Sequence, residues 1–274
     1  MAKMTEYTAA TRFDSGDILI KDGDNGTKKI TAANAASEFA GLVSSTQHRN
    51  VFREKNLGTS ITAAQKTAIR SGTFDDLFIG DYWTINNTRY DIADMDYWYN
   101  CGDDPALTKH HLVMIPHSAL YSAKMNETNT TEGGYVGSEM YTTNLNQAKT
   151  RISTDFGAML RTHRECLVNA VTDGYPSADA WFDSTVDLMN EIMVYGSYIH
   201  TPGNNGVTIP KRYMINKQQL ALFALSPKSI NTRSSFWLRD VVSATYFAYV
   251  NHDGGAYYFR ASGTLGVLPV FAIG

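Results

Sequence analysis

The residues that could catalyse a reaction or bind a metal are few and scattered along the sequence. His110 and His111 form a histidine cluster with Lys109, but adjacent histidines on a strand point to opposite faces and do not share one metal. His163 and Cys166 are spaced to lie on one helix, without a third residue to orient a catalytic pair. The acidic pairs at 75–76 and 103–104 lack the pattern of a calcium loop and are typical of solvated turns.

The catalytic motifs with a defined mechanism are absent from the sequence. It contains no G-x-S-x-G nucleophile elbow, no phosphate-binding loop and no G-x-G-x-x-G dinucleotide motif. We therefore expect no enzyme, no catalytic residue, no bound metal and no cofactor. Cys101 and Cys166 are too few for a disulfide framework; we expect two buried thiols, with a single bridge between them as the alternative.

Composition excludes further classes of function. The 274 residues carry a net charge of -3, which argues against a nucleic-acid-binding protein with its basic face. No apolar run approaches the roughly 18 to 20 residues that cross a bilayer, and the first residues lack the apolar stretch of a secretion signal, so we expect neither membrane insertion nor export by that route. Charged residues make up only 19% against roughly 25% in an average domain, while 16 residues are tyrosine.

The predicted helices and strands indicate a mixed α+β fold in two parts. Residues 1–46 contain two short strands around the turn at 22–26 and an alanine-rich helix at 32–42, too little to fold alone. Residues 47–274 form the main domain. Its predicted helices begin at the Thr62–Gln65 capping box, span 145–156, and run from 184 to about 195. Its predicted strands are 77–79, 82–85, 89–92, 112–115, 241–250, 256–260 and 266–273.

The C-terminal residues 241–274 use a restricted set of amino acids. They contain no Lys, Glu, Gln, Met or Trp, although the whole chain has 10 Met and 4 Trp. None of these five types is encoded by a codon ending in a pyrimidine. The residues that are present in this segment, such as Tyr, Asn, His, Asp and Arg, are reached by changing the first two bases of an Asn codon. Strand propensity explains the aromatic residues but not the missing Lys, Glu and Gln.

The segment also carries a specific resemblance. The residues 236–244, Phe247-Ala248, Val250, Gly255-Ala256, Ala261-Ser262 and 266–269 resemble the variable-region frame of diversity-generating retroelement target proteins, in particular those of gut-bacterial phages. The runs 72–83, 110–116 and 132–138 resemble the same phage family, so the resemblance covers about residues 50 to 274. One departure is Leu268, where the family usually has Arg; the change puts one packing or ion-pair contact in doubt.

The resemblance implies a C-type-lectin-like fold, shared with formylglycine-generating enzymes, in which variable residues on a rigid β scaffold form one exposed ligand-binding surface. The enzymes need reactive cysteines near the C-terminus, and this chain has none after Cys166. The variable region then spans 240–274. The implied ligand-binding residues are Thr245, Tyr246, Tyr249, Asn251, His252, Asp253, Tyr257, Tyr258, Phe259, Arg260, Gly263, Thr264 and Leu265. The implied scaffold residues of the site are Trp237, Arg239, Asp240, Phe247, Gly266 and Pro269.

These features predict a phage receptor-binding adhesin on the tail fibre or tail tip, whose partner is a bacterial surface protein or glycan. Residues 1–46 would attach to structural proteins of the virion, and analogy with phage fibres predicts a homotrimer. The alternatives are a head-decoration or fibre protein that adheres to host glycans or mucus, a bacterial surface-displayed variable protein, and an enzyme of the formylglycine-generating type.

Overall fold

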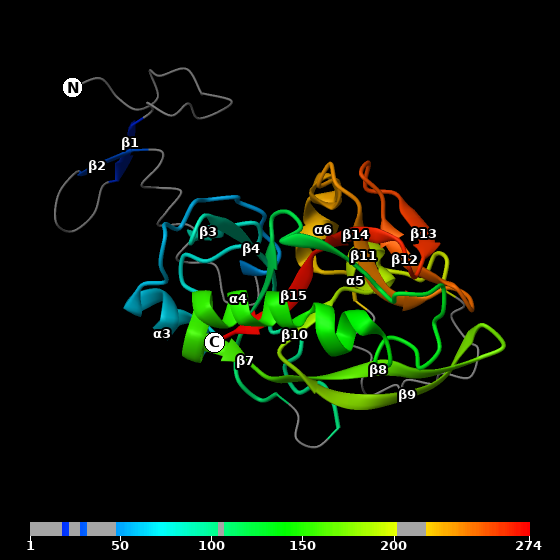
Figure 1. The fold of residues 1–274 in the computed structure, drawn as a ribbon. Coiled ribbons are helices and arrows are strands. Elements are labelled where there is room, and N and C mark those ends of the chain that lie inside the picture. Colours follow the sequence, from blue (N-terminus) through cyan, green and yellow to red (C-terminus); the bar gives the residue numbers. More distant parts are fainter. Residues whose placement is uncertain (1–17, 22–27, 32–47, 104–106, 202–217) are drawn as a thin grey trace. The chain divides into compact units, whose positions relative to one another are not determined.

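The computed structural model describes residues 18–21, 28–31, 48–103, 107–201 and 218–274. The chain divides into two compact units, Met1–Ser44 and Ser45–Gly274. In the first unit, β1 (Ile18–Lys21) pairs antiparallel with β2 (Lys28–Thr31), in the register Ile18 to Thr31. The two strands expected at this place are therefore present, whereas the expected helix at 32–42 lies outside the described residues. The second unit is mixed α+β, with most of its regular structure in sheets (Figure 1).

The larger sheet has six strands in the order β10-β15-β5-β4-β3, with β7 also paired to β15. Its strands are β3 (Tyr82–Ile85), β4 (Thr88–Met95), β5 (Leu112–Pro116), β7 (Leu160–Arg161), β10 (Val186–Leu188) and β15 (Pro269–Ile273). The last strand of the chain thus lies inside this sheet, paired antiparallel with β5, β7 and β10.

The smaller sheet has five strands in the order β13-β12-β11-β14-β6. Its strands are β6 (Tyr121–Lys124), β11 (Phe236–Val241), β12 (Tyr246–Val250), β13 (Ala256–Arg260) and β14 (Thr264–Val267). β11 and β14 pair in parallel, and the other neighbours pair antiparallel. Three of the five strands, β12, β13 and β14, come from the restricted segment 241–274, and β13 lies at the edge of the sheet.

The remaining elements cover these sheets. β8 (His163–Thr172) and β9 (Tyr175–Ser184) form a long hairpin, seen along the lower side of Figure 1. The helices are α3 (Ala63–Ser71), α4 (Asn146–Phe156), α5 (Glu191–Tyr195) and α6 (Ala221–Leu225), with the shorter turns η2 (Met140–Asn144), η3 (Gly157–Met159) and η5 (Pro227–Ile230). No helix in these described stretches is long and apolar enough to cross a membrane.

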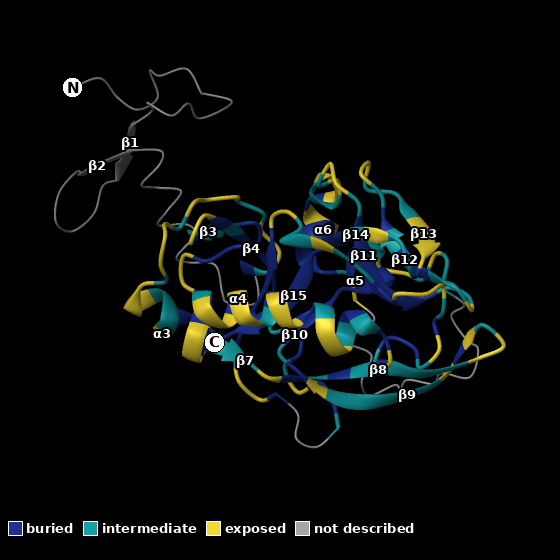
Figure 2. Cartoon of the chain, viewed as in Figure 1, coloured by how far each residue is buried: buried dark blue, intermediate teal, exposed yellow. Residues whose placement is uncertain are grey.

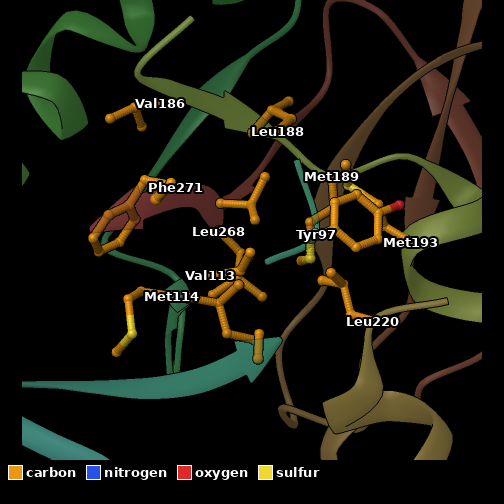
Figure 3. Close-up of a cluster of buried hydrophobic side chains, with 14 of the residues drawn as sticks. Tyr97, Val113, Met114, Val186, Leu188, Met189, Met193, Leu220, Leu268 and Phe271 are labelled. Atoms are coloured by element: carbon orange, nitrogen blue, oxygen red, sulfur yellow. The ribbon is translucent and has the colours of Figure 1, made fainter. Parts of the chain in front are cut away.

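One continuous hydrophobic core joins the two sheets. Leu268 and Phe271 enter it from the C-terminal segment, with 1% and 0% of their surface exposed. Figure 3 shows both side chains among Val113, Met114 and Leu188. Leu268, at the position where the resembling family usually has Arg, is therefore a core residue, and the apolar side chain fits its apolar surroundings without an unpaired charge.

Several local predictions are confirmed because the residues that specify them act over short distances. Thr62 Oγ1 accepts from Gln65 N and Gln65 Oε1 accepts from Thr62 N, so the capping box is present, and α3 ends at Gly72 in the left-handed region. Asn86 and Asn87 both have positive φ, as a tight β3–β4 hairpin requires. The predicted helix at 145–156 is α4, with Ala148, Ile152 and Phe156 buried on one face.

Other predictions are wrong where tertiary contacts decide the structure. The helix expected from residue 184 begins only at Glu191, and Val186–Leu188 is the strand β10 paired with β15. Residues 77–79 hold only an isolated bridge from Ile79 to Phe52. The strand expected at 241–250 divides into β11 and β12 around a turn, and the one at 266–273 divides into β14 and β15, which belong to different sheets.

Candidate ligand-binding surface

The candidate surface is built on the β12–β13 hairpin. The two strands pair with Tyr249 opposite Tyr257 and Phe247 opposite Phe259. β13 is an edge strand with β12 as its neighbour in the sheet. Ala261 N donates to Thr245 O, so the alternation of an antiparallel ladder directs the backbone N–H and C=O of Tyr258 away from β12. An edge strand of this kind offers both side chains and backbone groups to a ligand.

The turn of this hairpin is held by its own polar groups. Asn251 Oδ1 accepts from Asp253 N at 3.0 Å and from Gly255 N at 2.7 Å. Gly254, at φ +87°, accepts at its carbonyl from the Tyr195 hydroxyl at 3.0 Å. The Asn251 side chain thus stabilises the turn, so a change at this position would alter the hairpin as well as the surface.

One face of the hairpin carries an aromatic cluster, defined as Trp237, Tyr249, Tyr257 and Phe259. The Trp237 ring is fully buried and lies 6.3 Å from Tyr249 and 6.1 Å from Phe259, between ring centroids. Tyr249 lies 6.1 Å from Tyr257 and 6.0 Å from Phe259. Tyr257 is 53% exposed and Phe259 38% exposed. The cluster therefore combines the buried ring of Trp237 with the partly exposed rings of Tyr257 and Phe259.

The opposite face carries Tyr246, Tyr258 and Arg260. The rings of Tyr246 and Tyr258 lie 5.3 Å apart, and His200 packs edge-on against Tyr258 at 5.2 Å. His200 Nε2–H donates to the Ala256 carbonyl at 3.1 Å. Sequence reasoning missed His200, because it lies outside the restricted segment and reaches the hairpin only through the tertiary fold. The expected single surface is thus split over two faces of one hairpin by the alternation of strand side chains.

The predicted site residues sort cleanly by burial. All thirteen predicted ligand-binding residues are exposed or partly exposed, and all six predicted scaffold residues are buried. Figure 2 shows this exposed edge at β13, beside the buried strands of the same sheet. Thr264 and Leu265 lie apart from the hairpin, on β14, on the other side of β11. Gly263 lies under the Phe259 ring, where a Cβ would come within 2.0 Å of it, so these two positions are coupled.

A buried ionic network supports the surface from below. Arg239 donates to Glu165 Oε2 at 3.0 Å, and Trp98 Nε1 donates to Glu165 Oε1 at 2.9 Å. Burial disfavours the Arg239 charge, but the carboxylates of Glu165, Asp187 and Asp240 together outweigh burial and raise the pKa of Arg239 above its usual value. Burial also raises the pKa of Glu165, against the effect of Arg239. The pair is fully desolvated and fixes the position of β11.

A second buried pair ties β11 to the loop that carries His200. Asp240 Oδ2 accepts from Glu191 N at 2.5 Å. The Glu191 carboxylate accepts from the backbone N–H groups of Ile199, His200 and Thr201, at 3.0 to 3.1 Å. Burial, with a contribution from Glu191, raises the pKa of Asp240 to about 7. These bonds hold His200 against β13.

The structure does not bring together His163 and Cys166, which were first considered for chemistry. His163 and Cys166 lie on strand β8 rather than on a helix, and their spacing of three puts them on opposite faces; this prediction was wrong because β8 pairs with β9. His163 is buried and stacks on Trp98 at 3.8 Å, and burial lowers its pKa well below the usual value. Burial raises the pKa of the Cys166 thiol, with Asp179 adding to the effect.

The other candidates have structural partners. His110 contacts Asp96 at 2.7 Å, while the neighbouring His111 is buried and accepts from Trp98 N. Asp103 pairs with Arg164 at 2.6 Å. Both cysteines are outside any disulfide, and Cys101 is buried whereas Cys166 is partly exposed. In the part of the chain that the structure describes, no group of three or more His, Cys, Asp or Glu residues could hold a metal ion.

Comparison with known proteins assigns no family to this arrangement. No family model, no curated protein and no solved structure matches the chain.

Proposed function

We propose that the protein is a phage receptor-binding adhesin of the diversity-generating retroelement type. Residues 47–274 would form a C-type-lectin-like domain whose exposed C-terminal residues bind a bacterial surface ligand. The observation that carries the proposal is the sorting by burial of predicted variable and predicted scaffold positions. The thirteen predicted variable positions lie where side chains reach solvent, and the six predicted scaffold positions are buried.

The chemistry of the hairpin suits a binding surface that changes its specificity. Tyrosine and phenylalanine supply large contact areas at a low cost in side-chain entropy, as they do in antibody paratopes. Tyr257, Tyr258 and Phe259 are the large exposed apolar side chains of β13. Because their neighbours Trp237 and Phe247 are fully buried, the backbone can stay in place while the exposed residues differ.

Residues 1–46 would attach the protein to the virion, and a homotrimer would strengthen weak individual contacts by multivalency. In this proposal the protein acts at the tail fibre or tail tip and binds no nucleic acid. Labelling intact virions with an antibody against the chain tests the location. Label at the tail is expected, and label confined to the head would replace the tail assignment with head decoration.

The first experiment tests the retroelement. Sequencing the genes beside the coding region should reveal a reverse transcriptase and a near-identical template repeat that matches the codons after Trp237. Adenines should stand in the template at the codons for the thirteen positions. A neighbourhood without these two elements would overturn this proposal.

The second experiment tests the surface. The full chain, labelled with a fluorophore, is titrated onto a panel of gut-bacterial strains, and each strain that binds is retested with Tyr257→Ala and Tyr258→Ala. We expect these variants to lose binding at least about tenfold, because each removes an exposed aromatic anchor. Val51→Ala is the control, since Val51 is a 39% exposed apolar residue outside the hairpin. Equal losses in the control, or loss of folding by circular dichroism, would contradict the assignment.

A further inference from the structure

A cleft lies beside the tip of the β12–β13 hairpin, apart from the aromatic cluster. It has a volume of about 430 Å³ and is lined by Pro227, Lys228, Ile230, Asn231, Arg233, Asp253 and Gly254. Pockets that bind small molecules have volumes of roughly 300 to 1,000 Å³, so the cleft is large enough for one or two sugar rings. Five of its residues precede the restricted segment, and two belong to the hairpin turn.

The wall from residues 227–233 is basic and is held in an unusual conformation. Arg233 has a φ of +58°, rare for a residue with a side chain. Its backbone N–H donates to Asn231 Oδ1 at 3.0 Å, and Thr232 Oγ1 donates to Ser234 O at 2.8 Å. Among the described residues the Arg233 guanidinium has no hydrogen-bond or ion-pair partner. Local polar contacts thus hold a backbone outlier at a cationic residue that lines the cleft.

The opposite wall is the hairpin turn, packed closely against the first. A Cβ at Gly254 would lie 3.2 Å from Asn231 N, so the absence of a side chain there lets the two walls meet. Asp253, one of the predicted variable residues, brings a carboxylate to the cleft and contacts His252 at 3.3 Å. The cleft therefore has one wall from outside the restricted segment, with Arg233 and with Lys228, whose ammonium also lies 5.9 Å from the Phe52 ring centroid. The other wall carries a predicted variable position.

The lining selects among anionic ligands. The planar Arg233 guanidinium matches a carboxylate, to which it can donate two parallel hydrogen bonds. Asp253 repels a dianion such as a phosphate monoester but accepts hydrogen bonds from hydroxyl groups. Ile230 and Pro227 provide the apolar surface that a sugar ring contacts through its C–H groups. A ring that carries one carboxylate and several hydroxyl groups can contact Arg233, Asp253 and the apolar side chains at the same time.

We propose that this cleft is a binding site for an acidic sugar, a monosaccharide unit bearing one carboxylate, such as a uronic acid of a bacterial surface polysaccharide. The proposal deepens the adhesin function on which it rests, because it names a ligand class at one end of the same surface. Arg233 binds the carboxylate, and Lys228 adds positive charge. The residue at position 253 changes which anionic ligand the cleft prefers.

Titration of the full chain with D-glucuronate, followed by ligand-observed NMR at low salt, tests the site. We expect saturable binding of glucuronate, and at least about tenfold weaker binding of methyl glucoside, acetate and inorganic phosphate. Arg233→Gln should weaken glucuronate binding about tenfold or more, and Asp253→Asn should strengthen it. Arg70→Gln, a change of the same charge at an exposed residue of α3, is the control and should leave the affinity unchanged.

The outcomes separate this proposal from the adhesin function. If glucuronate fails to bind, or binds Arg233→Gln as well as the parent, the cleft is not an acidic-sugar site, even when bacterial binding by Tyr258 is intact. If acetate or phosphate binds as tightly as glucuronate, the site recognises charge alone and the sugar assignment is overturned. If glucuronate binding depends on Arg233 while no bacterial strain binds through Tyr258, the acidic-sugar site is supported and the adhesin function is overturned.

Discussion

β13 and β15 come from the same restricted segment and each contains one phenylalanine, yet they have opposite environments. In β13 the side chains of Tyr257, Tyr258 and Phe259 are 38 to 53% exposed. In β15, Val270, Phe271, Ala272 and Ile273 are completely buried. β13 lies at the edge of its sheet, whereas β15 lies inside the six-stranded sheet, between β10 and β5. Burial here is decided by neighbouring strands rather than by residue type.

This difference assigns different tasks to the two strands. A side chain on β15 contacts the core on both faces of the sheet, so its volume is constrained. The side chains of Tyr257, Tyr258 and Phe259 on β13 reach solvent, so their volumes are less constrained. One segment can therefore combine a fixed frame with a changeable surface. The following measurements test this difference between the two strands.

The largest expected effect separates two phenylalanines. Phe271 is fully buried and packs against Tyr90 and Phe156, with ring centroids 5.8 and 5.1 Å away. We expect Phe271→Ala to lower the free energy of unfolding by about 3 to 5 kcal/mol. Phe259→Ala, on β13, should lower it by less than about 1 kcal/mol. Denaturant unfolding monitored by tryptophan fluorescence measures both, and equal losses would refute the division between the strands.

The next expected effect is a pH dependence of the free energy of unfolding, which comes from the buried carboxyl group of Asp240. Because the pKa of Asp240 in the folded state is raised to about 7, the folded protein binds this proton more tightly than the unfolded chain. The resulting stability is fully present below about pH 4 and is lost as pH rises through 7. Asp240→Asn removes this dependence, while its amide oxygen can still accept from Glu191 N. The variant should gain on the parent by at most about 1.4 kcal/mol per pH unit between pH 4 and 7.

Unfolding of both proteins at a series of pH values measures this gain. Val51→Ala is the control, because Val51 is exposed and not ionisable, and this change should give a difference that stays flat over the same range. A flat difference for Asp240→Asn would show that the buried carboxyl does not govern the stability of β11.

A smaller effect on stability is expected at Gly266, one of the predicted scaffold residues. A Cβ at Gly266 would lie 2.9 Å from Ser235 O and 2.6 Å from the Ala119 Cβ. Gly266→Ala should therefore cost about 1 to 3 kcal/mol through overpacking. Gly255→Ala, whose nearest contact is the Asn251 side chain at 3.3 Å, should cost less than about 1 kcal/mol. Thermal unfolding of the two variants compares them, and a larger loss at Gly255 would contradict the assignment of Gly266 to the scaffold.

The smallest effect distinguishes two neighbours in the hairpin turn. Asn251→Ala removes the acceptor of two backbone N–H groups and should cost about 1 kcal/mol. His252→Ala, at an exposed position, should change stability by less than about 0.5 kcal/mol. If the two variants unfold alike in denaturant, Asn251 is a surface residue like its neighbour, and the turn is held by the backbone alone.

Local sequence signals predicted local structure well. The Thr62–Gln65 capping box, the Asn86-Asn87 turn and the face of α4 depend on residues a few positions apart, and all three are present. The helix expected from residue 184 failed because β10 pairs with β15, which lies more than eighty residues later in the chain. The helix expected for His163 and Cys166 failed for the same reason, since pairing with β9 imposes the strand.

The restricted alphabet of residues 241–274 can be read from the sequence without coordinates, and the frame that the segment resembles predicted thirteen positions that are exposed or partly exposed and six that are buried. The placement of these residues in space depends on tertiary contacts. It placed β13 at an edge and β15 in a core, divided the exposed residues between two faces, and brought His200 and Arg233 beside the hairpin. These juxtapositions join residues far apart in the chain, and strand pairing and core packing, rather than local propensity, create them.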